Sequence, residues 1–129
     1  MDARTAARLL SLGRIAAGVG LLAAPPLVAG AWTGRHARKA HARVLSRALG
    51  ARDLVIGLGA LAALGGRGAA TPWLLAGLVA DTTDLVVTLA ERDDLPDAAV
   101  PFIGSAAGAG IVLGLYGLTA GDSRAPVPA

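Results

Sequence analysis

Apolar residues occupy this chain in long stretches that short polar segments separate. Four such stretches cover residues 9–32, 48–64, 73–90 and 98–120. Each has a length within the range of about 17 to 25 residues that a helix needs to cross a bilayer. The pattern predicts an all-α fold, a membrane four-helix bundle that forms one domain over residues 1–129, with a short disordered tail at 121–129.

Prolines and glycines mark the ends of these stretches. The pair Pro25 and Pro26 interrupts the first stretch, so we expect its helix to bend or end just before them. A Gly-Gly pair at 65–66 ends the second stretch. Pro72 opens the third at a position typical of a first helical turn, and the acidic segment 91–97 leads into the fourth.

The N-terminal region also fits a second interpretation, a secretory signal peptide. Several arginines precede its apolar run, and Ala29-Gly30-Ala31 resembles a cleavage site. Because apolar residues continue beyond the prolines to Trp32, we expect the segment to be retained as the first span.

The polar segment 33–47 is strongly basic. It predicts a short interfacial basic helix between the first two spans, with its long side chains reaching the lipid headgroups, and a solvated loop is the alternative. We expect no nucleic-acid binding, because no aromatic residue alternates with the charges. Basic residues number seven on this side of the bundle and five on the other, which favours a cytoplasmic location for the segment. The residues predicted to face headgroups are Arg35, Arg38, Lys39, Arg43 and Arg47.

The composition favours lipid over water as the solvent. Hydrophobic residues make up 54% of the chain and charged residues only 16%, whereas soluble domains have about 25% charged residues. The 18 glycines suit membrane helices, whose backbones approach closely at small residues. A soluble helical protein is a less favoured alternative. The glycines predicted to pack helices form two GxxxG patterns in the fourth stretch, at Gly104, Gly108, Gly110 and Gly114, and Gly50 and Gly57 form a further stripe in the second.

Charged residues inside the apolar stretches are the strongest candidates for a site. An Asp at the centre of a span costs about 2.5 to 3.5 kcal/mol, so such residues are expected to face one another inside the bundle. The predicted intramembrane charge cluster consists of Arg14, Arg52, Asp53, Asp81 and Asp84.

The depth of each charge along its helix predicts the pairs within this cluster. At about 1.5 Å per residue, Arg52 lies level with Asp84, and Arg14 lies level with Asp81. Asp53 is left over, so it is either protonated or balanced by water or a cation. Two interpretations remain open. The cluster is either an ion-pair clasp that fixes helix order, or a site for a proton, a cation or a polar substrate.

Three segments of the chain resemble a known group of proteins. They are LGRIAAGVGLLAAPPLVAGAW (12–32), RALGARDLVIGLGAL (47–61) and PWLLAGLVADTTDLVVTLAE (72–91). The chain resembles small uncharacterised four-span integral membrane proteins of high-GC bacteria, whose architecture is loosely similar to that of DoxX-like four-helix proteins. The most specific pieces are Gly-Ala-Arg-Asp in the second segment and Ala-Asp-x-x-Asp in the third. The resemblance implies an architecture and a membrane location, and it implies no activity.

The sequence contains no catalytic motif. Cysteine is absent, and both histidines, His36 and His41, lie in the basic segment away from the acidic residues. An Mg²⁺ site at the aspartates is disfavoured because Arg14 and Arg52 compete for the same oxygens. We therefore expect no catalysis, no cofactor and no metal.

The expected function is that of a structural or accessory protein of the cytoplasmic (inner) membrane. We expect it to self-associate as a homo-oligomer or to join a larger membrane assembly as a subunit. The alternative is a proton- or cation-coupled small-molecule transporter or channel that uses the Asp cluster. The accessory role ranks first because so small a bundle is expected to leave little room for a cavity.

Overall fold

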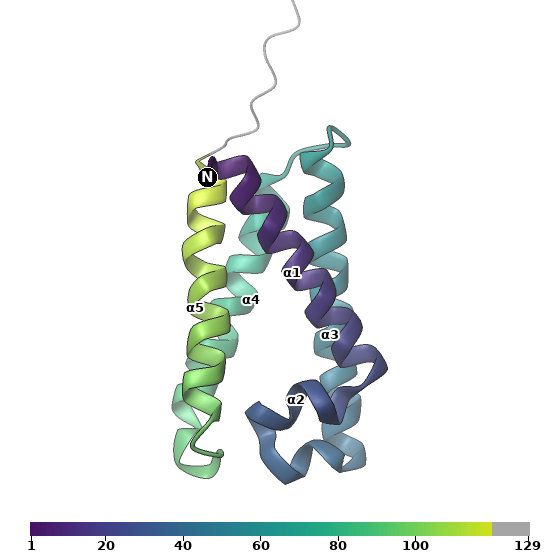
Figure 1. Ribbon diagram of the computed structural model, residues 1–129, viewed down its shortest axis with the longest axis vertical. Coiled ribbons are helices and arrows are strands. Elements are labelled where there is room, and N and C mark those ends of the chain that lie inside the picture. The colour runs from purple at the N-terminus through teal and green to yellow at the C-terminus, as the bar shows by residue number, and fades with distance from the viewer. Residues whose placement is uncertain (120–129) are drawn as a thin grey trace, which may run out of the picture.

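The computed structural model describes residues 1–119, which form an all-α protein; the tail expected at 121–129 lies outside these residues. Four long helices run up and down the molecule, and a short one, α2, lies across its lower end (Figure 1). The α-helices are α1 (Ala3–Ala23), α2 (Pro25–Thr33), α3 (Ala40–Leu64), α4 (Thr71–Ala90) and α5 (Ala99–Leu118), with two 3-10 helices, η1 (Gly34–Arg38) and η2 (Arg92–Asp94).

The proline pair shapes the lower end of the molecule, as the sequence predicts. α1 ends at Ala23, where the next residue still donates its N–H to the Gly20 carbonyl at 2.8 Å. Pro25 and Pro26 then form the first two residues of α2, where a backbone N–H would have no acceptor within the helix. α2 ends at Thr33, and the next residue, Gly34, has a φ of +58°, in the left-handed region that glycine adopts at little cost.

The prediction of a separate interfacial helix over 33–47 is only partly right. Its first residues form η1, but Arg43 and Arg47 lie in the first turns of α3, which continues to Leu64 without a break. The break between the two helices falls at Lys39, whose backbone is extended. α3 then runs on through Arg43 and Arg47, because no proline or glycine follows before Gly50, which lies inside the helix. All of the residues predicted to face headgroups are exposed: Arg35, Arg38, Lys39, Arg43 and Arg47.

Three of the described helices are long and apolar enough, judged by length and composition, to cross a membrane: α1, α4 and α5. The fourth expected span, 48–64, lies within α3, which is not one of them. Arg47, Arg52 and Asp53 lower the hydropathy of that helix. By composition alone, the described chain therefore has three candidate spans where the sequence predicts four.

Large apolar side chains face outward and small ones face inward. Ten of the fourteen buried hydrophobic residues are alanines, whereas Leu27 is 83% exposed and Val79 is 65% exposed. Two charged residues, Arg14 and Asp81, are buried. This distribution suits helices in lipid, which associate by close packing and polar contacts rather than by the hydrophobic effect.

Glycines bring the backbones of α1 and α3 close together. A Cβ placed on Gly18 of α1 would lie 2.7 Å from the Gly50 carbonyl oxygen, and one on Gly57 would lie 2.8 Å from the Ser11 carbonyl oxygen. The glycines therefore let the two backbones approach closely, and a Cβ at either glycine would clash with the facing backbone.

The glycines predicted to pack helices on α5 fall into two groups. Gly110 contacts Asp81, and a Cβ on Gly114 would lie 3.8 Å from Leu10. A Cβ on Gly104 or Gly108, in contrast, would have no neighbour within 4 Å. Among residues 1–119, only the second GxxxG pattern therefore packs against other helices.

Candidate functional site

Charged side chains from three helices meet in the middle of the bundle. α1 contributes Arg14, α3 contributes Arg52 and Asp53, and α4 contributes Asp81 and Asp84. We refer to these five residues as the ion cluster. They are the residues that the sequence singles out by the cost of placing them in lipid.

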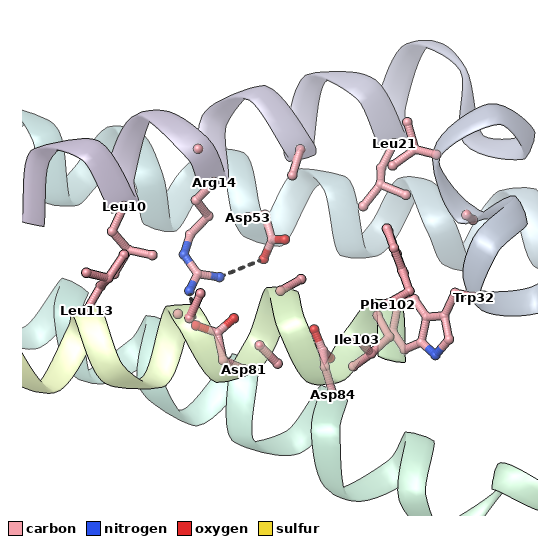
Figure 2. Close-up of a pocket in the computed structure, with 18 of the residues that line it drawn as sticks. Leu10, Arg14, Leu21, Trp32, Asp53, Asp81, Asp84, Phe102, Ile103 and Leu113 are labelled. Carbon is pink, nitrogen blue, oxygen red and sulfur yellow. Dashed lines mark hydrogen bonds and ion pairs between the residues drawn. The ribbon is translucent and has the colours of Figure 1, made fainter. Parts of the chain in front are cut away.

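Arg14 links α1 to both α3 and α4. Its Nη1 donates to Asp53 Oδ1 at 3.2 Å, and its Nη2 donates to Asp81 Oδ2 at 2.5 Å and to the Gly77 carbonyl oxygen at 3.3 Å. The Arg14 side chain is only 6% exposed and points from α1 towards the carboxylates (Figure 2). One guanidinium therefore holds three helices together.

Arg52 links α3 to α4. Its Nη1 and Nη2 donate to the two carboxylate oxygens of Asp84 at 3.0 and 2.7 Å, which is the paired geometry that an arginine fork and a carboxylate favour. Its Nε also donates to Asp53 Oδ1 at 3.1 Å. Both pairs expected from depth, Arg52 with Asp84 and Arg14 with Asp81, are therefore present.

Asp53 has hydrogen-bond partners that the sequence does not predict. The sequence leaves it without a partner, but its Oδ1 accepts hydrogen bonds from both Arg14 and Arg52. It joins the two pairs into one network, because it lies one residue after Arg52 on the same turn of α3. The formal imbalance of three carboxylates against two guanidinium groups remains.

Two glycines make room for the ion cluster. A Cβ on Gly77 would lie 3.1 Å from Arg14 Nη2, and a Cβ on Gly110 would overlap the Asp81 carboxylate. Gly77 lies on the same row of α4 as the aspartates, so it could have been recognised from helical spacing. The contact of Gly110 with Asp81 depends on how α5 is rotated, which the sequence does not specify.

A pocket of about 370 Å³ lies beside the ion cluster. Its lining is mostly apolar, with four charged residues on its floor. Its two ends are closed by Leu10 with Leu113, and by Trp32 with Phe102 (Figure 2). The expectation of little room for a cavity is therefore wrong. The charged floor consists of Arg14, Asp53, Asp81 and Asp84.

The pocket exists because α1 and α5 meet only near their upper ends (Figure 1). There the Tyr116 hydroxyl donates to the Met1 carbonyl oxygen at 3.0 Å, and Gly117 packs against Ala7. Lower down, α2 contacts both α1 and α5 and keeps them apart. The sequence predicts the proline break that produces α2, but not the direction in which α2 then runs.

α2 is fastened to α4 next to the ion cluster. Trp32 Nε1 donates to Thr88 Oγ1 at 3.0 Å, and the Thr88 hydroxyl donates to the Asp84 carbonyl oxygen at 2.6 Å. Thr88 is 1% exposed, so this contact is shielded from solvent. The hydrogen bond between Trp32 and Thr88 therefore holds the lower end of the pocket against α4, the helix that carries Asp81 and Asp84.

Within residues 1–119, no group of three or more histidine, cysteine, aspartate and glutamate residues has a geometry that could hold a metal ion. His36 lies in η1 and His41 in the first turn of α3. Both histidines are exposed. The chemistry that the arrangement offers is therefore that of buried, hydrogen-bonded charges beside an apolar pocket.

The chain was compared with protein-family models, with curated proteins and with solved structures. None of them matches it. The resemblance to small four-span membrane proteins of high-GC bacteria therefore stays a prediction.

Proposed function

We propose that this chain is a small multi-pass protein of the cytoplasmic membrane in which α1, α3, α4 and α5 all cross the bilayer. The observation that carries the proposal is the distribution of side chains. Charged groups pair in the interior, while residues such as Val79 and Leu27 are exposed on the outside. Water would favour the reverse arrangement, whereas a lipid environment accounts for both features.

The contacts of α3 support a fourth crossing. At its lower end, Arg47 Nε donates to the Leu22 carbonyl oxygen of α1 at 3.2 Å. At its upper end, the Leu64 carbonyl oxygen accepts from Arg4 Nη2 at 2.5 Å. α3 therefore extends as far as α1 does. Two of the charged residues that lower its hydropathy, Arg52 and Asp53, pair with charged side chains of other helices, so α3 need not expose these two to lipid.

The distribution of basic residues supports one orientation. Among residues 1–119, six basic side chains belong to the lower end of the molecule and three to the upper end. Because short loops rich in Lys and Arg stay in the cytoplasm, we propose that the lower end is cytoplasmic. The lower set is Arg35, Arg38, Lys39, Arg43, Arg47 and Arg92, and the upper set is Arg4, Arg8 and Arg67.

Within the membrane we assign the chain an accessory role without catalysis, as a self-associating protein or a subunit of a larger assembly. The open space beside Gly104 and Gly108 supports this role, because small residues let a second helix approach closely. A second candidate function is proton- or cation-coupled transport. It is favoured by the pocket, which puts three carboxylates next to a cavity.

Single cysteines test the proposed crossings of α3 and α4 cleanly, because the chain has no cysteine of its own. Ala40→Cys and Ala98→Cys lie at the lower end and Ala69→Cys at the upper end, and all three positions are exposed. In intact cells, a membrane-impermeant maleimide is expected to label Ala69→Cys alone. In inverted membrane vesicles, it is expected to label the other two. Labelling of Ala40→Cys and Ala69→Cys from the same side would show that α3 does not cross and would overturn the proposal.

A further inference from the structure

We propose that the pocket binds an amphiphilic cation, with an apolar body of about ten carbon atoms and a primary ammonium head that meets the ion cluster. The inference goes beyond the proposed function. It relies on the membrane location only for the route by which the ligand enters.

The size of the pocket limits the ligand. A volume of 370 Å³ lies within the range of about 300 to 1,000 Å³ that small-molecule sites occupy. At about 30 Å³ for each water-sized group, the pocket holds about twelve non-hydrogen atoms. Its walls are apolar side chains of α1 and α5, among them Leu10, Leu21, Ile103 and Leu113, so most of those atoms must be hydrocarbon.

The floor of the pocket determines the charge of the ligand. It presents three carboxylates and one guanidinium, with Arg52 paired to Asp84 and Asp53 but outside the lining. If all five groups of the ion cluster are ionised, they carry one net negative charge. An anionic head would meet the three carboxylates, whereas a single cationic head would neutralise the cluster.

Two carboxylate oxygens are available to such a head. Asp53 accepts its hydrogen bonds through Oδ1 and Asp81 through Oδ2. No side chain of residues 1–119 donates to Asp53 Oδ2 or to Asp81 Oδ1. An ammonium group carries three donors and no acceptor, so it has a donor for each of these oxygens and does not compete with the arginines for the oxygens that they hold.

The ligand has a route into the pocket between α1 and α5. Leu9 of α1 is 53% exposed and Phe102 of α5 is 40% exposed, and both residues line the pocket. The pocket therefore opens at the side of the bundle, where these helices diverge (Figure 1). In a bilayer this opening faces hydrocarbon, so an amphiphile can enter with its apolar part already in lipid.

The test uses Trp32 as a reporter, because it lines the pocket whereas Trp73 does not. In a Trp73→Phe protein in phosphatidylcholine vesicles, 10-bromodecylammonium is expected to quench Trp32 fluorescence saturably. It should bind at least about tenfold more tightly than 10-bromodecanol, because hydrogen bonds to charged groups are the strong ones. The anion 10-bromodecanoate should quench no more than its partition into lipid explains.

A matched pair of variants ties the quenching to the pocket. Gly13 lines the pocket and Gly104 does not, and a Cβ added to either residue has no neighbour within 4 Å. Gly13→Leu should therefore fold, fill the pocket and abolish saturable quenching. Gly104→Leu should fold and leave the quenching unchanged, and both variants keep every charge of the chain.

Three results overturn the inference. Equal or tighter binding of the alcohol or the anion would contradict the cationic head, and unaltered binding by Gly13→Leu would contradict the pocket. If Trp73→Phe fails to fold, the thermal unfolding temperature of the unmodified protein decides. Decylammonium must then raise this temperature more than decanol does. Cysteine labelling reports separately on the proposed crossings, so a failure of either proposal can be told from a failure of the other.

Discussion

Each arginine of the ion cluster compensates more than one carboxylate, so the removal of a single side chain leaves a charge without its partner. Arg52 holds both oxygens of Asp84, and their side chains are 28% and 16% exposed. Removing one member of a buried pair typically costs about 3 to 5 kcal/mol, because the other charge remains in a poor solvent. Arg52 also donates to Asp53, so removing the Arg52 side chain should destabilise the protein more than removing the Asp84 side chain.

We expect Arg52→Leu and Asp84→Leu each to lower the free energy of unfolding in detergent by at least about 3 kcal/mol, with the larger loss for Arg52→Leu, and to reduce the yield of folded protein. The control is Arg92→Leu, whose pair with Asp93 joins side chains that are 63% and 91% exposed. This control should change stability by at most about 1 kcal/mol. Thermal melting measures all three variants, and unchanged melting of both cluster variants would rule out the clasp.

For single residues, the sequence predicts which charged side chains meet but not how they share hydrogen bonds. The helical rise alone makes Arg52 level with Asp84 and Arg14 level with Asp81, and both pairs form. The position of Asp53 between the two arginines depends on side-chain rotamers and on the rotation of α3, which no spacing rule supplies.

The contact between α1 and α3 depends on the glycines that lie where the two helices cross. Gly18→Ala places a methyl group 2.7 Å from the Gly50 carbonyl oxygen, so α1 must shift away from α3. We expect a loss of about 1 to 3 kcal/mol in the free energy of unfolding. Gly13→Ala on the same helix enters open space and should gain up to about 1 kcal/mol from its higher helix propensity. Equal effects of both substitutions on thermal unfolding would contradict the close crossing.

Among the elements, the sequence predicts helices and their proline boundaries better than their directions. The first helix ends at the proline pair as expected. α4 occupies Thr71–Ala90, where the third span is expected at 73–90. The secondary structure of the basic segment 33–47 is ambiguous in the sequence, because charged residues are compatible both with a separate surface helix and with the first turns of α3. The pocket could not be predicted, since it depends on where α2 packs between α1 and α5.

For the whole molecule, the open glycines of α5 predict how copies associate. A Cβ on Gly104 or Gly108 would meet no other atom of the described chain, so this face can accept a second helix. We expect the protein to sediment as an oligomer in mild detergent and Gly104→Leu to shift it towards the monomer. Gly13→Leu should keep the oligomer. A monomeric parent protein, or an unchanged oligomer in Gly104→Leu, would contradict association through this face.

The links made by Arg14 also have a consequence for biosynthesis. α1 precedes α3 and α4 in the chain, so in co-translational insertion this arginine reaches the membrane before Asp53 and Asp81 do. Released alone into hydrocarbon, α1 would carry a bare cation, which is costly there. We therefore expect α1 to stay in a hydrated environment until α3 and α4 arrive. For the four proposed crossings, we therefore expect α1, α3 and α4 to enter the bilayer together rather than one finished helix at a time.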